Sequence, residues 1–415
     1  MLDIRFIREN PELVQENAQK KGYTISIEKL LEVDTKRRDL QQQVDDLREQ
    51  RNAISAQMKG GGKPSAETIE QGRALKDQVA GLETELVAVQ EEFFGLMVQI
   101  PNMMQPDVPI GGEEDSVEIK KWGEQTSGAM DHLDFAVKRD WVDFERGAKV
   151  AGAKFYYLKG DLALLENAIT QFALDLVTKK GFTYLTVPAL VNSRIATGTG
   201  FAPRTSDQSD EYYIEGDDLS LIATAEIPIT GYHADEIIDE AKLPLFYAGY
   251  SASFRKEAGT YGKHARGLFR VHQFNKLELY AFTTPDQSVD VHEKILAIEE
   301  EIWQAIGIPY HIINIASGDL GAPASKKYDI EYWSPVDGMY RELTSASNCT
   351  DFQARNLNIR VRRTDGKIEV LHTLNGTAVS LARSLVAVLE HYQNPDGTLR
   401  VPDVLQPYMG GRTVL

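Results

Sequence analysis

Two stretches of the chain repeat apolar residues at intervals of three and four, the spacing of a coiled coil. The positions of the first repeat are Leu30, Val33, Arg37, Leu40, Val44, Leu47, Arg51, Ile54 and Met58. Those of the second are Leu75, Val79, Leu82, Leu86, Val89, Phe93, Leu96 and Ile100. Residues 59–64 (KGGGKP) separate the repeats. The pattern predicts two matched helices, joined as an antiparallel hairpin over about residues 28–100.

Each helix of this hairpin would be about 48 Å long at 1.5 Å per residue. A helix of that length is too long for one small domain to bury, so we expect an arm that projects into solvent. Arg37 and Arg51 occupy positions in the apolar seam and weaken the contact between the helices. Periodicity alone favours a coiled-coil spacer or a dimerisation device.

The segments on either side of the arm differ in composition. Before the arm, Asn10-Pro11 signals a helix start, because Asn favours the N-cap and Pro the first helical position. After it, residues 101–115 (PNMMQPDVPIGGEED) have the proline, glycine and acidic residues of a linker. We therefore expect an N-terminal domain over 1–104, a linker over 105–115 and a second domain over 116–415.

The second domain mixes helical and strand patterns. Apolar residues between Leu158 and Lys180 recur at helical spacing, Gly181 ends this segment, and residues 182–188 (FTYLTVP) read as a strand. Residues 368–374 alternate as a further strand. The run 375–377 (NGT) is then expected to turn into a helix whose apolar stripe leaves out Arg383.

The most informative stretch runs over residues 254–278 (FRKEAGTYGKHARGLFRVHQFNKLE). Two alternating runs flank a loop rich in charge and glycine, which is a hairpin signal. Side chains alternate between the faces of a strand, so five residues of the second run share one face: Arg270, His272, Phe274, Lys276 and Glu278. Phe274 and Glu278 would lie roughly 13 Å apart along it. Arg255, Glu257 and Arg266 fall on the first strand and in the loop, where they could meet phosphates.

Composition narrows the class of protein. The chain has 415 residues, enough for two or three domains, and a net charge of −17, so an RNA partner would need local basic patches. The one cysteine, Cys349, excludes an intramolecular disulfide and a Cys-rich zinc site. No apolar run reaches membrane-spanning length, and residues 1–15 are charged rather than signal-like. We expect a cytoplasmic protein that does not bind membranes.

The 254–278 stretch resembles motif 2 of class II aminoacyl-tRNA synthetases (FR-x-E, a loop, then R-x-x-x-F), in the wording of the seryl-tRNA synthetase family. Further matches are TAE at 224–226, YRELTSASN at 340–348 and, as motif 3, NGTAVSLAR at 375–383. The helix, strand and Pro188 of residues 158–188 resemble motif 1, which forms the homodimer interface in the family. The resemblance covers nearly the whole chain.

The resemblance implies an α+β fold, with an antiparallel sheet flanked by helices and preceded by the helical hairpin. It implies ATP-dependent activation of L-serine to seryl-adenylate and transfer to the 3′ end of serine tRNA, with selenocysteine tRNA as a further substrate where present. The cofactors would be ATP and Mg²⁺. In the family the N-terminal hairpin reaches the long variable arm of the tRNA.

The resemblance also assigns roles to residues. ATP would be bound by Arg255, Lys256, Glu257, Arg270, Val271, Phe274, Glu342, Leu343, Thr344, Ser345 and Arg383. Serine would be bound by Thr224, Ala225, Glu226, Arg255, Glu278, Asn375 and Thr377. Arg255 and Arg383 would be the catalytic residues, bridging the α-phosphate and holding the γ-phosphate. Glu342 and Ser345 offer the hard oxygen ligands that Mg²⁺ prefers, while Arg266 and Arg270 would assist at phosphate or the tRNA end.

The motif 3 segment departs from the wording NGSGLAVGR of many relatives. Thr377 replaces a serine that faces the substrate hydroxyl, so a hydroxyl is kept but its selectivity is open. Ala346 stands where relatives often carry cysteine. Neither change removes a residue that the proposed chemistry needs.

Taken one at a time, the same residues also have ordinary structural interpretations. Thr224 could cap a helix, Glu342 and Ser345 could form a surface pair, and Arg383 could be a solvated helix arginine. The lysines of the hairpin, taken individually, fit a solvated strand face: Lys256, Lys263 and Lys276. The agreement of several motifs favours the functional interpretation.

Three alternative functions fit parts of the pattern. A class II synthetase for another small amino acid would share the chemistry. A relative that aminoacylates a carrier protein would lack the long arm, which this chain has. A non-enzymatic paralogue would keep the arm and lose Arg255 and Arg383, both of which are present.

Overall fold

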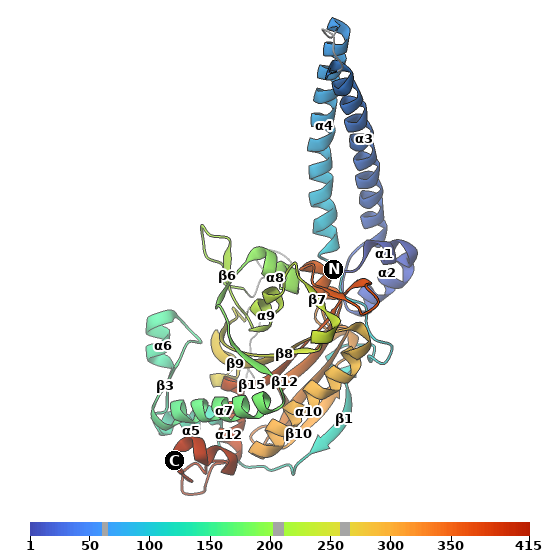
Figure 1. Cartoon of the computed structure of the whole chain (residues 1–415). Helices are drawn as coiled ribbons and strands as arrows, with labels where there is room; N and C mark the ends of the chain where they lie inside the picture. Colours follow the sequence, from blue (N-terminus) through green and yellow to red (C-terminus); the bar gives the residue numbers. More distant parts are fainter. Residues whose placement is uncertain (60–64, 202–210, 258–265) are drawn as a thin grey trace. The chain divides into compact units, whose positions relative to one another are not determined.

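The computed structural model of the chain describes residues 1–59, 65–201, 211–257 and 266–415 (Figure 1). It separates into two compact units, Leu2–Pro101 and Asn102–Leu415, and Met1 belongs to the second. Three segments singled out in the sequence lie wholly or largely outside the described residues. They are the glycine loop of the arm, the polar run 205–211 (TSDQSDE), whose composition predicts a surface loop, and the centre of the motif 2 loop with Lys263.

The N-terminal unit consists of four helices, α1 (Ile4–Glu9), α2 (Pro11–Lys20), α3 (Ile27–Lys59) and α4 (Ala66–Met97). The coiled-coil prediction is confirmed, since α3 and α4 are matched in length at 33 and 32 residues and lie side by side (Figure 1). Val44 and Val89 are among the buried seam residues. Arg37 does less harm to the seam than expected, because its guanidinium lies 4.7 Å from the centre of the Phe93 ring and binds Asp34.

The second unit is built on an eight-stranded sheet, which confirms the α+β prediction. In spatial order its strands are β1 (Val117–Trp122), β10 (Tyr310–Asn314), β11 (Lys326–Ser334), β12 (Met339–Thr350), β15 (His372–Ser380), β9 (Gln273–Thr283), β8 (Leu245–Phe254) and β4 (Thr183–Thr186). All neighbouring pairs are antiparallel except β4 and β8. The predicted hairpin is therefore β8–β9, which lies between β15 and the edge strand β4.

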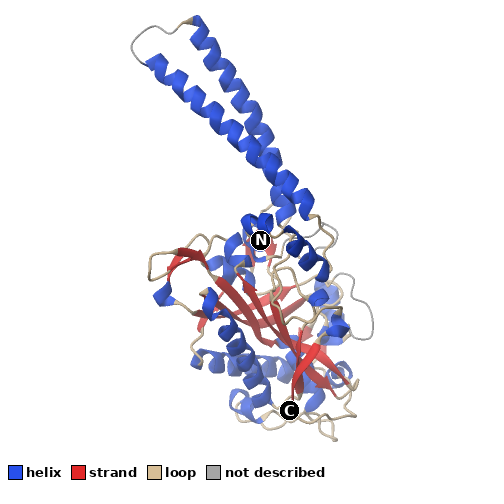
Figure 2. Cartoon of the chain, turned by 90° about the vertical axis from the view of Figure 1, so that its right-hand side faces the viewer, coloured by secondary structure: helices blue, strands red, loops and turns tan. Residues whose placement is uncertain are grey.

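Alternation along β9 divides the core. Leu277, Leu279 and Ala281 pack into a large apolar cluster with α7 (Gly160–Lys179), α10 (Ser288–Ile306) and α12 (Leu381–His391). Tyr280 and Phe282 belong to a second, smaller cluster with α9 (Glu226–Tyr232) and α11 (Phe352–Asn356). Figure 2 shows the helices gathered along the sheet. Both faces of β9 thus support the fold, and the face of Tyr280 and Phe282 also carries Phe274 and Lys276, which line a pocket.

Short elements complete the unit. They are α5 (His132–Lys138), β2 (Val142–Asp143), α6 (Phe144–Ala151), β3 (Tyr157–Leu158), β5 (Leu190–Asn192), α8 (Ser193–Thr199), β6 (Leu219–Leu221), β7 (Ile237–Asp239), β13 (Arg360–Arg362) and β14 (Ile368–Val370). Within the part of the chain that the structure describes, no helix is both long and apolar enough to cross a membrane.

The predicted turn at 375–377 is wrong. Strand β15 continues through Asn375, Gly376 and Thr377, and α12 begins only at Leu381. The strand is paired on both sides, with Gly376 opposite Ala346 of β12 and Thr377 opposite Glu278 of β9. Two ladders of hydrogen bonds override the local turn preference of Asn-Gly.

Glycine at 376 has a packing reason. An added Cβ there would lie 2.2 Å from Cγ2 of Ile295 and 2.6 Å from Oε1 of Glu299, both on α10. The helix therefore touches the backbone of β15 directly.

Candidate active site

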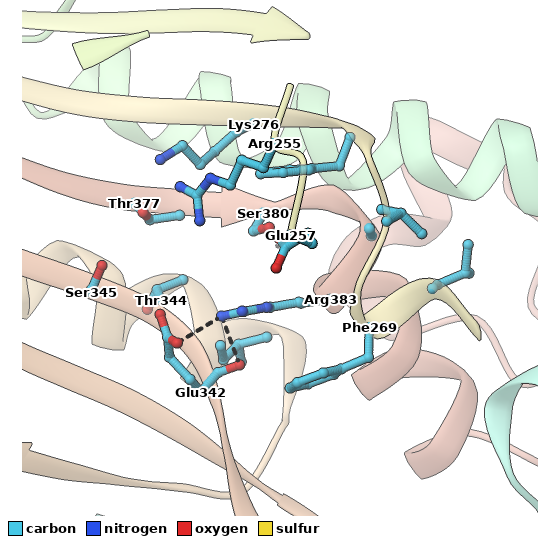
Figure 3. A pocket seen from close by; sticks show the side chains of 15 residues that line it. Arg255, Glu257, Phe269, Lys276, Glu342, Thr344, Ser345, Thr377, Ser380 and Arg383 are labelled. Atoms are coloured by element: carbon cyan, nitrogen blue, oxygen red, sulfur yellow. Dashed lines mark hydrogen bonds and ion pairs between the residues drawn. The ribbon is translucent and has the colours of Figure 1, made fainter. Parts of the chain in front are cut away.

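A pocket opens beside the β8–β9 hairpin (Figure 3). It is lined by Arg255, Glu257, Leu268, Phe269, Val271, Phe274, Lys276, Glu342, Leu343, Thr344, Ser345, Thr377, Ser380, Ala382 and Arg383. These residues come from the hairpin, from β12 and from the junction of β15 with α12. Every motif of the second domain singled out in the sequence, apart from motif 1 and the TAE segment, contributes to the lining.

Arg255 and Phe274 face each other across the hairpin. Arg255 follows directly after β8, and its N–H donates to the carbonyl of His272 at 3.0 Å, which extends the hairpin pairing beyond the strand. Its guanidinium carbon lies 5.3 Å from the centre of the Phe274 ring. A cation and an aromatic plane thus share one wall of the pocket.

The opposite wall carries an ion pair between Arg383 and Glu342. Nη1 of Arg383 lies 3.1 Å from the Glu342 carboxylate and also donates to the Glu342 carbonyl at 3.4 Å (Figure 3). Burial alone would raise the pKa of Glu342, but Arg383, Lys327 and Arg255 outweigh it and lower the pKa below its ordinary value. Glu342 is therefore ionised at neutral pH.

Phe269 holds the arginine from the other side. Its ring centre lies 5.0 Å from the guanidinium carbon of Arg383 and 5.2 Å from that of Arg341. The preceding residue, Leu268, donates its backbone N–H to Nε2 of His132 at 3.3 Å. Nδ1 of His132 lies 3.3 Å from the Glu390 carboxylate, so the imidazole proton belongs on Nδ1 and neither ring nitrogen is left for a metal.

The remaining candidate ATP residues of the hairpin divide into two groups. Glu257 lines the pocket and pairs with Arg270 at 3.0 Å, which places Arg270 behind it rather than in the lining. Lys256 does not line the pocket; its amine lies 5.9 Å from the ring centre of Tyr212. Arg266 pairs with Asp134 at 2.7 Å instead of facing the pocket.

The candidate serine residues form a buried polar corner beside this pocket. Thr224 donates to the Glu278 carboxylate at 3.1 Å, and Lys276 pairs with the same carboxylate. Thr377 lies opposite Glu278 in the β15–β9 ladder and reaches the pocket. Lys276 is only 7% exposed, so its assignment to a solvated strand face is wrong. A buried lysine needs a carboxylate partner, and Glu278 supplies it.

Glu226 lies at the deep end of this corner. Its Oε1 accepts from the amides of Asn375, at 2.9 Å, and Gln353, at 2.6 Å. Burial and the neighbouring Glu278 raise the pKa of Glu226 to about 7. Ala225 is fully buried and forms the N-cap of α9, while the Glu226 N–H lies 3.3 Å from the Thr224 hydroxyl.

The residues that could hold a divalent cation lie on β12. Glu342 and Ser345 both line the pocket, and Asp329 of β11 pairs with Ser345 in the ladder. Oδ1 of Asp329 is buried without a hydrogen-bond partner among the described residues, and its other oxygen lies 3.2 Å from Nζ of Lys327. Burial raises the pKa of Asp329 against the attraction of Lys327. A set of carboxylate and hydroxyl oxygens fits Mg²⁺.

Sequence reasoning missed several residues of the site, namely Phe269, Lys276, Lys327, Asp329, Gln353 and Ser380. Periodic alternation did place Lys276 on one face with Phe274 and Glu278, but its side chain was assigned to solvent instead of the site. No local pattern would have found Gln353, because the two acceptors of its amide nitrogen lie 127 and 154 residues away in the sequence. Ala346 is fully buried and lies outside the lining.

Comparison with known proteins agrees with this arrangement. The family model of the seryl-tRNA synthetase N-terminal domain matches residues 1–104, and that of the tRNA synthetase class II core domain (G, H, P, S and T) matches residues 210–392. A serine–tRNA ligase from Dictyoglomus turgidum is 47% identical over 99% of this chain and 98% of its own length. One from Rubrobacter xylanophilus is 42% identical over 100% and 99%.

Solved structures give the same result. The seryl-tRNA synthetase from Pyrococcus horikoshii, complexed with ATP, superposes with a TM-score of 0.89 and 40% identity, covering 100% of this chain and 99% of that one. The cytoplasmic serine–tRNA ligase from Naegleria fowleri, in complex with AMP, gives a TM-score of 0.84 and 31% identity, covering 100% and 98%. Similarity of this extent, over the arm and the catalytic sheet alike, means that the chain belongs to the seryl-tRNA synthetase family.

Proposed function

We propose that the protein activates L-serine with ATP to form seryl-adenylate and then transfers the seryl group to the 3′ end of serine tRNA. The observation that carries the proposal is the convergence on one pocket of Arg255, Phe274 and the Arg383–Glu342 pair, next to the buried carboxylate of Glu278. Relatives named serine–tRNA ligase, and a family structure complexed with ATP, support it.

In the activation step a serine carboxylate oxygen attacks the α-phosphorus of ATP, the bond from that phosphorus to the bridging oxygen breaks, and pyrophosphate leaves. Such a reaction requires mainly positioning and charge stabilisation. Arg255 bridges the serine carboxylate and the α-phosphate, Phe274 stacks on adenine, and Arg383 holds the γ-phosphate. In the transfer step a hydroxyl of the terminal ribose attacks the seryl carbonyl carbon and AMP leaves.

Other residues orient the nucleotide. Glu257 and the main chain at Val271 position it, with Lys256 and Arg270 as outer contacts of the same hairpin. Glu342 and Ser345, on the segment that also supplies Leu343 and Thr344, would hold Mg²⁺, which neutralises phosphate charge when bound. Arg383 forms an ion pair with Glu342, so when ATP binds the guanidinium must give up part of this ion pair to contact the phosphate.

The amino acid would lie in the polar corner. Thr224 and Glu278, with Ala225 and Glu226 behind them, receive the serine ammonium, and Asn375 and Thr377 face its hydroxyl. A pocket whose buried groups require a hydroxyl partner rejects alanine, because an unpaired buried polar group costs about 1–3 kcal/mol. Threonine must be rejected by size.

The deciding experiment is serine-dependent ATP–pyrophosphate exchange, with threonine, alanine and glycine as competitors, followed by charging of serine tRNA. We expect exchange with serine above the other three. Faster exchange with another amino acid would mean that this amino acid, and not serine, is the substrate. A complete lack of exchange would refute the proposed activity.

We infer that residues 1–104 form a tRNA-binding domain, that 105–115 are a linker and that 116–415 form the catalytic domain of a cytoplasmic homodimer, with motif 1 at the dimer interface.

Replacing residues 28–100 with a short Gly/Ser linker should spare exchange and reduce tRNA charging about a hundredfold, because the arm supplies much of the RNA contact. Equal charging by the shortened protein would make the arm a spacer. Sedimentation of the full chain tests the homodimer.

A further inference from the structure

Gln353, in the short helix α11, is fully buried and uses every hydrogen-bonding position of its amide. Its nitrogen donates to Oε1 of Glu226 at 2.6 Å and to the carbonyl of Thr199 at 3.1 Å. Its oxygen accepts from the hydroxyls of Tyr280, at 2.8 Å, and Thr373, at 2.7 Å. An amide has two donor hydrogens and two acceptor lone pairs, so none is left over.

These partners allow only one orientation of the amide. The Glu226 carboxylate and the Thr199 carbonyl are acceptors, so a flipped amide would place its oxygen against two other oxygens. Buried polar groups that lose their partners are costly, and the cost is highest beside a charge. Gln353 is thereby locked in place from four different segments: the end of α8, the start of α9, β9 and β15.

The locked amide acts on Glu226. Oε1 of Glu226 accepts hydrogen bonds from the amides of Gln353 on α11 and Asn375 on β15, which together fix the position of this oxygen. Glu226 is 7% exposed and Glu278 is 2% exposed, and the charge of Glu278 helps to raise the pKa of Glu226. Two buried acidic groups that interact in this way attract cations, and Lys276 already pairs with Glu278.

We propose that Gln353 is a positioning residue for the amino acid substrate: it orients the Glu226 carboxylate toward the substrate ammonium group and so sets the affinity for serine without affecting that for ATP. This inference rests on the proposed function, because it assumes that the amino acid occupies the corner of Glu226 and Glu278. Gln353 lies outside the pocket lining, and the proposal has it act through the Glu226 carboxylate to which it donates.

A purely structural role would have different kinetic consequences. If Gln353 only filled the core, its removal would lower the fraction of folded enzyme, which reduces kcat and leaves both KM values unchanged. If it orients Glu226, removal raises the KM for serine while the KM for ATP stays constant. The split between the two KM values therefore separates the interpretations.

The experiment compares exchange kinetics of the full-length enzyme with Gln353→Leu and Gln353→Glu. Leucine removes the donors, and glutamate additionally turns an acceptor toward Glu226. We expect the KM for serine to rise roughly tenfold to hundredfold in Gln353→Leu and further in Gln353→Glu. The KM for ATP should stay within about twofold. An unchanged KM for serine, or equal changes for both substrates, would overturn the inference.

A second pair of variants covers the case in which position 353 does not tolerate change. Thr373→Val removes one of the two hydroxyls that hold the Gln353 oxygen, and should raise the KM for serine about threefold. Thr283→Val is the matched control. It makes the same substitution on neighbouring β9, at a fully buried hydroxyl without a hydrogen-bond partner among the described residues.

Equal effects of Thr373→Val and Thr283→Val would reject the role of Gln353. Failure of the proposed function looks different, because the unmodified enzyme would then show no serine-dependent exchange at all.

Discussion

The site has two ends, the pocket and the polar corner beside it, and they hold charge in different ways. At the nucleotide end, charges are held in ion pairs that stay partly hydrated: the Glu342 side chain is 39% exposed and is bound by Arg383. At the amino acid end, Glu278 and Glu226 are almost completely buried and are held by hydroxyl and amide groups as well as by Lys276. A partly hydrated pair can exchange partners when a polyphosphate arrives, whereas a buried network keeps one geometry, which suits the recognition of one small cation.

The largest effect is expected where both ends meet. Arg255→Ala should reduce serine-dependent exchange about a thousandfold, because we propose that this guanidinium stabilises the charge that develops between serine and the α-phosphate. Circular dichroism should show an intact fold. Arg194→Ala, which removes an exposed arginine paired with Asp235, is the control and should keep normal exchange. Near-normal exchange in Arg255→Ala would refute the role of this residue.

The next largest effect belongs to the buried end. Glu278→Gln should raise the KM for serine about a hundredfold, because it removes the negative charge and leaves Lys276 buried without its carboxylate. The KM for ATP should change little. The matching variant at the nucleotide end, Arg383→Ala, should raise the KM for ATP and change the KM for serine little. If either variant altered both KM values equally, the two ends would not be separate.

The pH dependence should also differ between the two ends. Burial and Glu278 raise the pKa of Glu226 to about 7, so the group is mostly protonated at pH 6 and mostly ionised at pH 8. Only the carboxylate attracts the serine ammonium, so the KM for serine should fall about tenfold as the pH rises across this range. Glu342, whose pKa is lowered, stays ionised throughout. Glu226→Gln should flatten the profile for serine, and a flat profile in the unmodified enzyme would contradict this assignment.

The smallest effect is expected at Thr377. Thr377→Ser keeps the hydroxyl and should change the KM for serine by less than about twofold, whereas Thr377→Val keeps the shape, loses the hydroxyl and should raise it about tenfold. Indistinguishable values for the two variants would mean that the hydroxyl does not face the substrate.

The parts of the fold and site that the sequence predicted are those that depend on local patterns. Phe274 and Glu278 could be placed on one face because a strand has a fixed alternation, and Arg255 could be added from the FR-x-E pattern. The arm could be outlined because its apolar repeat is long. The strand through Asn375–Thr377 could not, since pairing with β12 and β9 decides it rather than the local Asn-Gly signal. Gln353 joins segments distant in the chain, and such contacts leave no periodic trace.

Gly376 couples the position of helix α10 to that of strand β15. At this point α10 packs against the backbone of β15 with no side chain between them. We therefore expect a shift of the helix to move the strand that carries Thr377. Enlarging Ile295 or adding a methyl group at position 376 should therefore alter which amino acid the enzyme accepts, although neither residue lines the pocket.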